Sequence, residues 1–131
     1  MKPADVIPYI GLPWKSGATG PDEYDCWGLL RHIQLQYFGI VLPLIVVGDE
    51  SGCRDMFDEK INNREWVPVV TPRHGDGVLL RGGDLPHVGV YLDLDGGGIL
   101  HALEGVGVVF THARSLPAMG FGRTTYYRFE K

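Results

Sequence analysis

The chain has 131 residues, of which 44% are hydrophobic and 21% are charged, and these values are typical of one globular domain. Its formal net charge is −4 at pH 7, and its lysine and arginine residues are scattered singly. We therefore expect a single domain over residues 1–131 and no nucleic-acid partner, because no basic cluster is available to neutralise a run of phosphates.

The N-terminal segment, from Met1 to Trp14, is interrupted by prolines and contains a single lysine. It lacks the charged start and the continuous apolar stretch of a signal peptide, and it predicts a short helix around Pro3 to Tyr9. The longest apolar run, Ile40 to Val47, is too short to span a bilayer. We expect a protein that is synthesised in the cytoplasm without a signal peptide and that has no membrane span.

A longer helix is predicted from Asp25 onward, because apolar residues recur there at three- and four-residue spacing over about four turns. Asp25 can cap this helix by accepting a hydrogen bond from a backbone N–H of the first turn, and Gly39 can end it in a left-handed conformation. The apolar face is expected to contain Leu29, Leu30, Ile33, Tyr37 and Phe38, and the opposite face Arg31, His32, Gln34 and Gln36.

The second half of the chain predicts a β-sheet. A second helix is expected from Ser51 to Asn62, and beyond Pro72 short apolar runs alternate with glycine turns, of which Gly96 to Gly98 is typical of a hairpin. The expected fold class is α+β, with the helix that begins at Asp25 packed on a five- or six-stranded antiparallel sheet. The clearest strands are Gly77 to Arg81, His87 to Leu94, Ile99 to Leu103, Val106 to Thr111 and Thr124 to Glu130.

Cys26 is placed at the start of the longer helix, where free N–H groups and a partial positive charge favour an anion. An ordinary thiol is only about 3% ionised at neutral pH, so a nucleophilic cysteine needs such an environment. Gly28 leaves room in the first turn for another backbone or a substrate. A disulfide between Cys26 and Cys53 is an alternative that the absence of an export signal disfavours, and Cys53 is interpreted as incidental.

Two histidines lie in alternating strand-like runs that a glycine turn connects. His87 shares a face with Gly89 and Tyr91, and His101 belongs to the next strand, so the two imidazoles can lie side by side. In this interpretation His87 accepts the thiol proton of Cys26, and His101 orients His87. The other histidines, His32, His74 and His112, are expected to have solvent or loop roles.

Simpler interpretations remain open for these residues. A lone cysteine on an apolar helix is usually packed, and a lone histidine on a strand is usually a core or surface group. A metal site built from one cysteine and two histidines is a further alternative, but the chain lacks the closely spaced ligand pairs of structural zinc. We favour a hydrolytic thiol over a metal site.

These motifs, in this order, resemble the NlpC family of papain-like cysteine peptidases, which cut peptides of the bacterial cell wall. The resemblance extends over nearly the whole chain and rests on five segments: Tyr9 to Trp14, Tyr24 to Leu29, Gly75 to Asp76, His87 to Tyr91 and Leu100 to Ala102. It implies a papain-like fold in which the helix beginning near Cys26 carries the nucleophile.

The resemblance also implies roles for single residues. Cys26 is then the nucleophile, His87 the base and His101 the third, polar member of a triad, with no metal or cofactor. Asp25, Trp14 and Trp27 are expected to bind the substrate, a peptidoglycan stem peptide cut between D-glutamate and the diamino acid. The family often has a small residue in place of Trp27 and a tyrosine in place of Trp14, so substrate preference can differ here; the indole N–H of Trp14 can replace the lost hydroxyl donor.

A narrower resemblance concerns Trp27 and its surroundings. The segments Asp25 to Leu29, Phe38 to Pro43 and Tyr126 to Arg128 are similar to the peptidase domain of K-type tail assembly proteins of lambda-like phages. This implies a protein associated with a phage or prophage tail, with tail-tip proteins as partners, that acts at the bacterial cell wall. A tail assembly module that keeps the fold without turnover is the alternative, and acyl transfer on another substrate is a third hypothesis.

Overall fold

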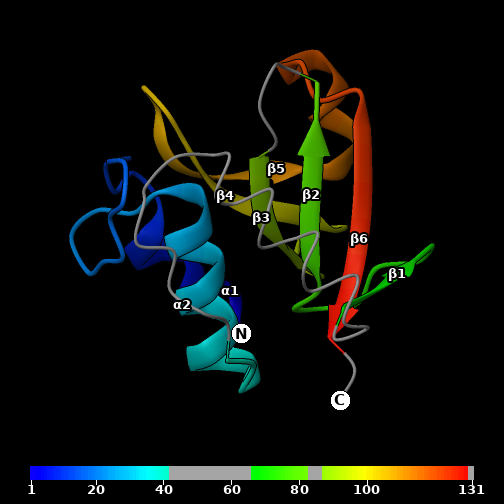
Figure 1. Ribbon diagram of the computed structural model, residues 1–131, viewed down its shortest axis with the longest axis horizontal. Helices are drawn as coiled ribbons and strands as arrows, with labels where there is room; N and C mark the ends of the chain where they lie inside the picture. The colour runs from blue at the N-terminus through cyan, green and yellow to red at the C-terminus, as the bar shows by residue number, and fades with distance from the viewer. Residues whose placement is uncertain (42–65, 83–86, 130–131) are drawn as a thin grey trace.

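The computed structural model describes residues 1–41, 66–82 and 87–129. Short helices α1 (Pro3–Val6) and η1 (Ile7–Tyr9) precede the longer helix α2 (Cys26–Phe38). The strands form a six-stranded antiparallel sheet in the order β1-β6-β2-β3-β4-β5 (Figure 1). Their bounds are β1 (Trp66–Val69), β2 (Gly77–Arg81), β3 (His87–Leu92), β4 (Gly98–Leu103), β5 (Gly107–His112) and β6 (Arg123–Phe129), with η2 (Ala113–Ser115) and η3 (Pro117–Met119) between the last two.

The α+β architecture predicted from the sequence is confirmed, and so are most of the elements. Strand β1 was not predicted, because Pro68 cannot donate a ladder hydrogen bond and argues against a strand. At the edge of the sheet, where β1 lies, only one side of the strand needs a partner, so proline is tolerated. The helix expected from Ser51 to Asn62, together with Cys53, lies outside the described residues.

Helix α2 begins and ends as its local sequence predicts. Asp25 is the N-cap, and its side chain accepts a hydrogen bond from the Gly28 N–H. Gly39 is the C-cap, with a left-handed φ of 67°, and its N–H donates to the Gln34 carbonyl. Both predicted caps are confirmed.

Two residues of α2 lie on the side opposite to the prediction. Gln34 is buried and its Nε2 donates to the Gly75 carbonyl at 3.0 Å, whereas Tyr37 is exposed. A buried amide is stable when a backbone group satisfies it, and hydropathy alone does not reveal such a partner. The assignment of Gln34 to the outer face and Tyr37 to the inner face was therefore wrong.

The N-terminal segment packs against His32 on the outer side of α2, so the solvent role expected for His32 is also wrong. The Tyr9 hydroxyl lies 2.9 Å from His32 Nε2, and the rings of Tyr9 and Tyr24 contact the imidazole. Burial lowers the pKa of His32, and the neighbouring Arg31 lowers it further. His74 and His112 have loop and surface partners: His74 bonds to Met1 and Asp93 backbone groups, and His112 to the Asp95 side chain.

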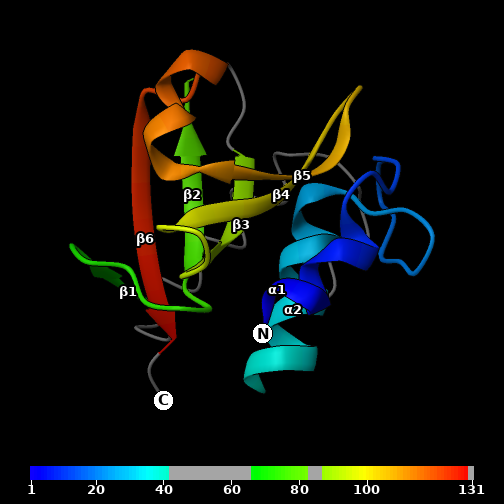
Figure 2. The same ribbon diagram turned by 180° about the vertical axis from the view of Figure 1, so that it is seen from behind.

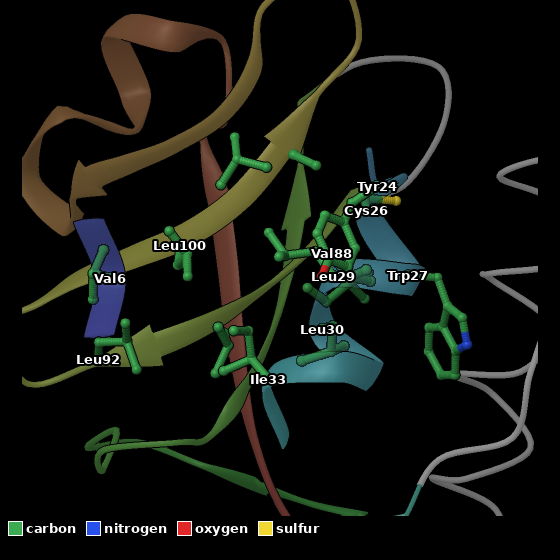
Figure 3. Close-up of a cluster of buried hydrophobic side chains, with 14 of the residues drawn as sticks. Val6, Tyr24, Cys26, Trp27, Leu29, Leu30, Ile33, Val88, Leu92 and Leu100 are labelled. Carbon is green, nitrogen blue, oxygen red and sulfur yellow. The ribbon is translucent and has the colours of Figure 1, made fainter. Parts of the chain in front are cut away.

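The sheet buries residues on both faces. On one face the body of α2 packs on β3 and β4 (Figure 3), and on the other face the segment of η2 and η3 covers β2, as Figure 2 shows from behind. The α2 face includes Leu29, Leu30 and Ile33 of the helix with Val88, Val90, Leu100 and Ala102 of the strands, and the other face includes Val78, Leu80, Ile99 and Leu116.

The start of α2 and the start of β3 lie at the same end of the molecule in both views (Figure 1, Figure 2). The chain that leads into α2 is attached to β5: the Gly11 N–H donates to the Val108 carbonyl at 2.9 Å, and the Val108 N–H donates to the Leu12 carbonyl at 2.9 Å.

None of the helices within the described ranges has the length and hydropathy needed to cross a bilayer.

A buried ion pair joins β6 to the turn before β2. Nη2 of Arg128 lies 3.0 Å from Oδ2 of Asp76, and its Nε donates to Oδ1 at 3.3 Å. The Asp76 side chain is 7% exposed and also accepts from the Arg73 N–H at 2.7 Å. Because the pair is largely removed from water, loss of one partner leaves a buried charge.

We predict that Arg128→Met lowers the free energy of unfolding by about 3 kcal/mol, because the Asp76 carboxylate stays buried without its cation. The control is Lys15→Met, which removes an exposed pair with Glu23 whose side chains are 68% and 42% exposed; there we expect a loss below about 1 kcal/mol. Urea denaturation at pH 7 measures both. Equal losses in the two variants would contradict the structural role of the pair.

Candidate active site

Cys26 is the first residue of α2, and the residue is 5% exposed. It belongs to the same buried cluster as Val88, which follows His87 in β3 (Figure 3). Cys26 is thus next to the free N–H groups and the positive end of the dipole of a helix, a place where anions are generally stabilised.

The loop before Cys26 is held against the helix by the Asp25 carboxylate. Oδ1 accepts from the Gly28 N–H at 2.6 Å, and Oδ2 accepts from the Gly17 N–H at 3.0 Å. Burial raises the pKa of Asp25 and the nearby Cys26 thiolate raises it further, whereas the hydrogen bonds from Gly28 and Gly17 lower it. The cap predicted for Asp25 thus also fixes the loop.

Gly28 is required by the close approach of this loop. A Cβ atom built at Gly28 would overlap the Ala18 carbonyl oxygen and lie 3.0 Å from Oδ1 of Asp25. The same Ala18 carbonyl accepts from the Asp25 N–H at 3.0 Å. The expectation that a glycine here admits another backbone is confirmed.

His87 and His101 form a buried hydrogen-bonded pair on neighbouring strands. Nε2 of His87 lies 2.9 Å from Nδ1 of His101, and the two residues are 7% and 0% exposed. A Cβ atom built at Gly89 would lie 3.0 Å from Cβ of His101, so the glycine leaves room for that residue. The prediction that the two imidazoles lie side by side is confirmed.

Two further residues complete the surroundings of the histidines. Nε2 of His101 lies 2.9 Å from Oγ1 of Thr111 in β5. The Phe121 ring stacks on His87 with centroids 5.4 Å apart and meets His101 edge-on. Sequence reasoning identified neither residue: Thr111 was noted only as a strand end, and Phe121 follows a segment with no predicted element.

The pKa of His101 is lowered from 6.5 to about 3, first by burial and then by the charge of His87. His101 is therefore neutral at physiological pH, with one ring nitrogen that donates and one that accepts. A neutral, buried imidazole can orient His87 without competing for the thiol proton.

The histidines and the body of α2 lie on opposite faces of the sheet. Val88 and Val90 pack against α2, whereas His87 contacts Phe121, which packs on the other face. Cys26 and His87 can therefore meet only where the first residues of α2 and β3 come together. The contact between the Cys26 sulfur and His87 stays a prediction.

The two tryptophans predicted to bind substrate flank this region. Trp14 is half-buried against the core and forms a backbone bridge with Tyr24. Trp27 is 3% exposed and belongs to the core cluster (Figure 3). Their contact with substrate, like that of Asp25, stays a prediction.

Within the described ranges, no group of three or more His, Cys, Asp or Glu side chains is arranged to hold a metal ion.

Comparison with known proteins identifies the family. Residues 11–119 match the model of the NlpC/P60 family. The chain belongs to the NlpC/P60 family. It is also similar to the crystal structure of the NlpC/p60 domain of the peptidoglycan hydrolase SagA, with a TM-score of 0.59 and 25% identity over 94% of this chain and 92% of that one. No curated protein sequence matches the chain. The papain-like NlpC fold implied by the sequence is thus confirmed.

We predict that Gly28→Ala lowers the free energy of unfolding by roughly 1 to 3 kcal/mol, because the added methyl group forces the Ala18 carbonyl away from the helix start. Gly122→Ala is the matched control, since a Cβ atom there meets nothing within 4 Å. Thermal and urea denaturation of both variants test this. A stability of Gly28→Ala equal to that of Gly122→Ala would contradict the close packing of the loop.

We also predict that His101 makes stability fall with acid. Between pH 6.5 and about 3 the unfolded chain protonates this residue while the folded protein keeps it neutral, so the free energy of unfolding decreases as pH falls. The loss approaches about 1.4 kcal/mol for each pH unit within this window. Urea titrations from pH 7 to pH 4 should show a shallower decrease in His101→Asn, which cannot titrate. An equal decrease in the free energy of unfolding of the wild-type protein and of His101→Asn over this pH range would contradict the lowered pKa of His101.

Proposed function

We propose that this protein is a cysteine peptidase that hydrolyses stem peptides of bacterial peptidoglycan, with Cys26 as nucleophile, His87 as base and His101 as the residue that orients His87. Membership of the NlpC/P60 family and the likeness to a peptidoglycan hydrolase domain support a cell-wall peptidase. The buried hydrogen bond between His87 and His101, near the end of the molecule where α2 begins, is the observation that carries the proposal.

The reaction that these groups can perform is acyl transfer through a thioester. His87 takes the proton of Cys26, and the sulfur attacks the carbonyl carbon of the scissile amide. The C–N bond breaks as His87 returns the proton to the leaving nitrogen. Water, activated by His87, then cleaves the thioester, releases the carboxylic acid and restores the thiol. The N–H groups at the start of α2 can stabilise negative charge on the sulfur and on the carbonyl oxygen.

The residues around the nucleophile suggest how a charged peptide is held. Each oxygen of Asp25 is bonded to one backbone N–H and keeps a second lone pair for a donor on the substrate. Trp14 carries an indole N–H in the loop that precedes Cys26. We propose that these groups, with Trp27 next to the thiol, bind the stem peptide for cleavage between D-glutamate and the diamino acid.

We further propose that the protein is associated with a phage or prophage tail, contacts tail-tip proteins and acts at the cell wall of the infected bacterium. Support comes from the residues that resemble K-type tail assembly proteins, above all Trp27 directly after Cys26 and the Tyr126-Tyr127-Arg128 sequence. Pull-down of tail-tip proteins by the Cys26→Ala protein tests this association separately from catalysis.

The proposed activity predicts that purified protein cleaves muropeptides into products whose masses identify the bond. Cys26→Ala should lose at least about a thousandfold in rate, because the substitution removes the proposed nucleophile. His87→Asn should show a comparable loss, whereas His112→Asn, which changes a surface histidine bonded to the Asp95 side chain, should keep wild-type activity. Liquid chromatography with mass spectrometry measures the products.

Two outcomes would reject the peptidase. One is the absence of cleavage by folded wild-type protein, and the other is equal cleavage by Cys26→Ala. If the catalytically silent protein still bound tail-tip proteins, the assembly module without turnover would become the better account. Cleavage of a different amide bond would retain the reaction and change only the substrate assignment.

A further inference from the structure

Both ring nitrogens of His101 are used inside the protein. Nδ1 of His101 lies 2.9 Å from Nε2 of His87, and Nε2 of His101 lies 2.9 Å from Oγ1 of Thr111. Thr111 is 8% exposed, so bulk water does not readily replace this hydroxyl. The three side chains form one hydrogen-bonded line across the neighbouring strands β3, β4 and β5.

Two arrangements of protons fit this line, because His101 is neutral and carries a single N–H. In the first, His101 donates from Nδ1 to Nε2 of His87 and accepts from the Thr111 hydroxyl at Nε2. In the second, His87 donates from Nε2 to Nδ1 of His101, and His101 donates from Nε2 to the Thr111 oxygen. The hydroxyl of threonine can serve in either direction.

Only the second arrangement leaves His87 able to act as a base. Its Nε2 is occupied by His101, so Nδ1 is the ring nitrogen that remains for the Cys26 proton. In the first arrangement Nδ1 of neutral His87 already carries a hydrogen and has no lone pair in the ring plane. After proton transfer, the imidazolium donates from both nitrogens, and His101 must again accept at Nδ1. The catalytic states therefore share one tautomer of His101.

We propose that Thr111 is a positioning residue whose hydroxyl oxygen accepts the Nε2–H of His101 and so holds that ring in the tautomer that keeps His87 a base. This inference rests on the proposed function, because it takes Cys26 and His87 as nucleophile and base. Thr111 acts through His101, its hydrogen-bond partner.

Replacement by valine isolates the hydroxyl, because valine has nearly the same shape as threonine. In Thr111→Val the Nε2–H of His101 is buried without an acceptor, which penalises the catalytic tautomer. We expect kcat to fall by about 10- to 100-fold with little change in KM. Thr111→Ser retains the hydroxyl and should keep the rate within about threefold of wild type. The control Thr125→Val makes the same change at a half-buried position of β6 and should leave the rate unchanged.

The tautomer is measured directly by long-range ¹H–¹⁵N correlation spectra of the histidine rings in ¹⁵N-labelled protein. Wild type and Thr111→Ser should carry the His101 hydrogen on Nε2, and Thr111→Val should shift it toward Nδ1. The rate of Cys26 alkylation by iodoacetamide, in a Cys53→Ser background across pH 5 to 9, gives a second readout. At pH 7 it should fall in Thr111→Val and recover in Thr111→Ser.

The proposal fails if His101 carries its hydrogen on Nδ1 in the wild-type protein, a test that needs no variant to fold. It also fails if Thr111→Val keeps the wild-type tautomer and rates, or if Thr111→Ser is as slow as Thr111→Val. Failure of the proposed function looks different. Wild-type protein would then cleave no muropeptide, while the tautomer and alkylation measurements would still decide the role of Thr111.

Discussion

The imidazole of His101 has no exposed surface, so each of its ring nitrogens must find a partner within the protein. This requirement connects three strands, because the partners come from β3 and β5 on either side. The residue opposite is Gly89, where a side chain would crowd His101, and Phe121 covers the imidazoles from the other side. A misplaced strand would leave a buried nitrogen unsatisfied, at a cost of about 1 to 3 kcal/mol. The histidine pair thus constrains the sheet that holds it.

Cys26 is anchored by a separate set of bonds. The Asp25 carboxylate bridges the Gly17 and Gly28 N–H groups, and the Ala18 carbonyl lies where a side chain at position 28 would be. Further back, the chain pairs with β5 at Val108. Through β5, the strand that also supplies Thr111, the loop that leads into Cys26 is connected to the sheet that holds the histidines. A single strand therefore contributes to the placement of both halves of the site.

Local signals explain what the sequence could predict. The Asp25 cap and the Gly39 end depend on residues within one helix, and the pairing of the two histidine strands follows from a glycine turn between them. The features that were missed depend on tertiary contacts. Gln34 is buried because the distant Gly75 carbonyl accepts from it, and β1 tolerates Pro68 because it forms the sheet edge. Thr111 can be recognised as a partner of His101 only from the strand register. The register pairs Thr111 with Ile99, which lies on the same face of the sheet as His101.

Trp27 shows how the residue beside Cys26 can be large without disturbing the hydrogen bonds around it. Its side chain is 3% exposed and belongs to the buried cluster, so a large residue directly after Cys26 is accommodated by packing. The hydrogen bonds that hold Asp25 and the histidines involve other atoms and are independent of the size of this side chain. Substitution beside the thiol can therefore change the surroundings of Cys26 while Asp25, His87 and His101 stay in place. If Cys26 is the nucleophile, as proposed, divergence at position 27 is expected to change the peptide that is recognised before it changes the reaction.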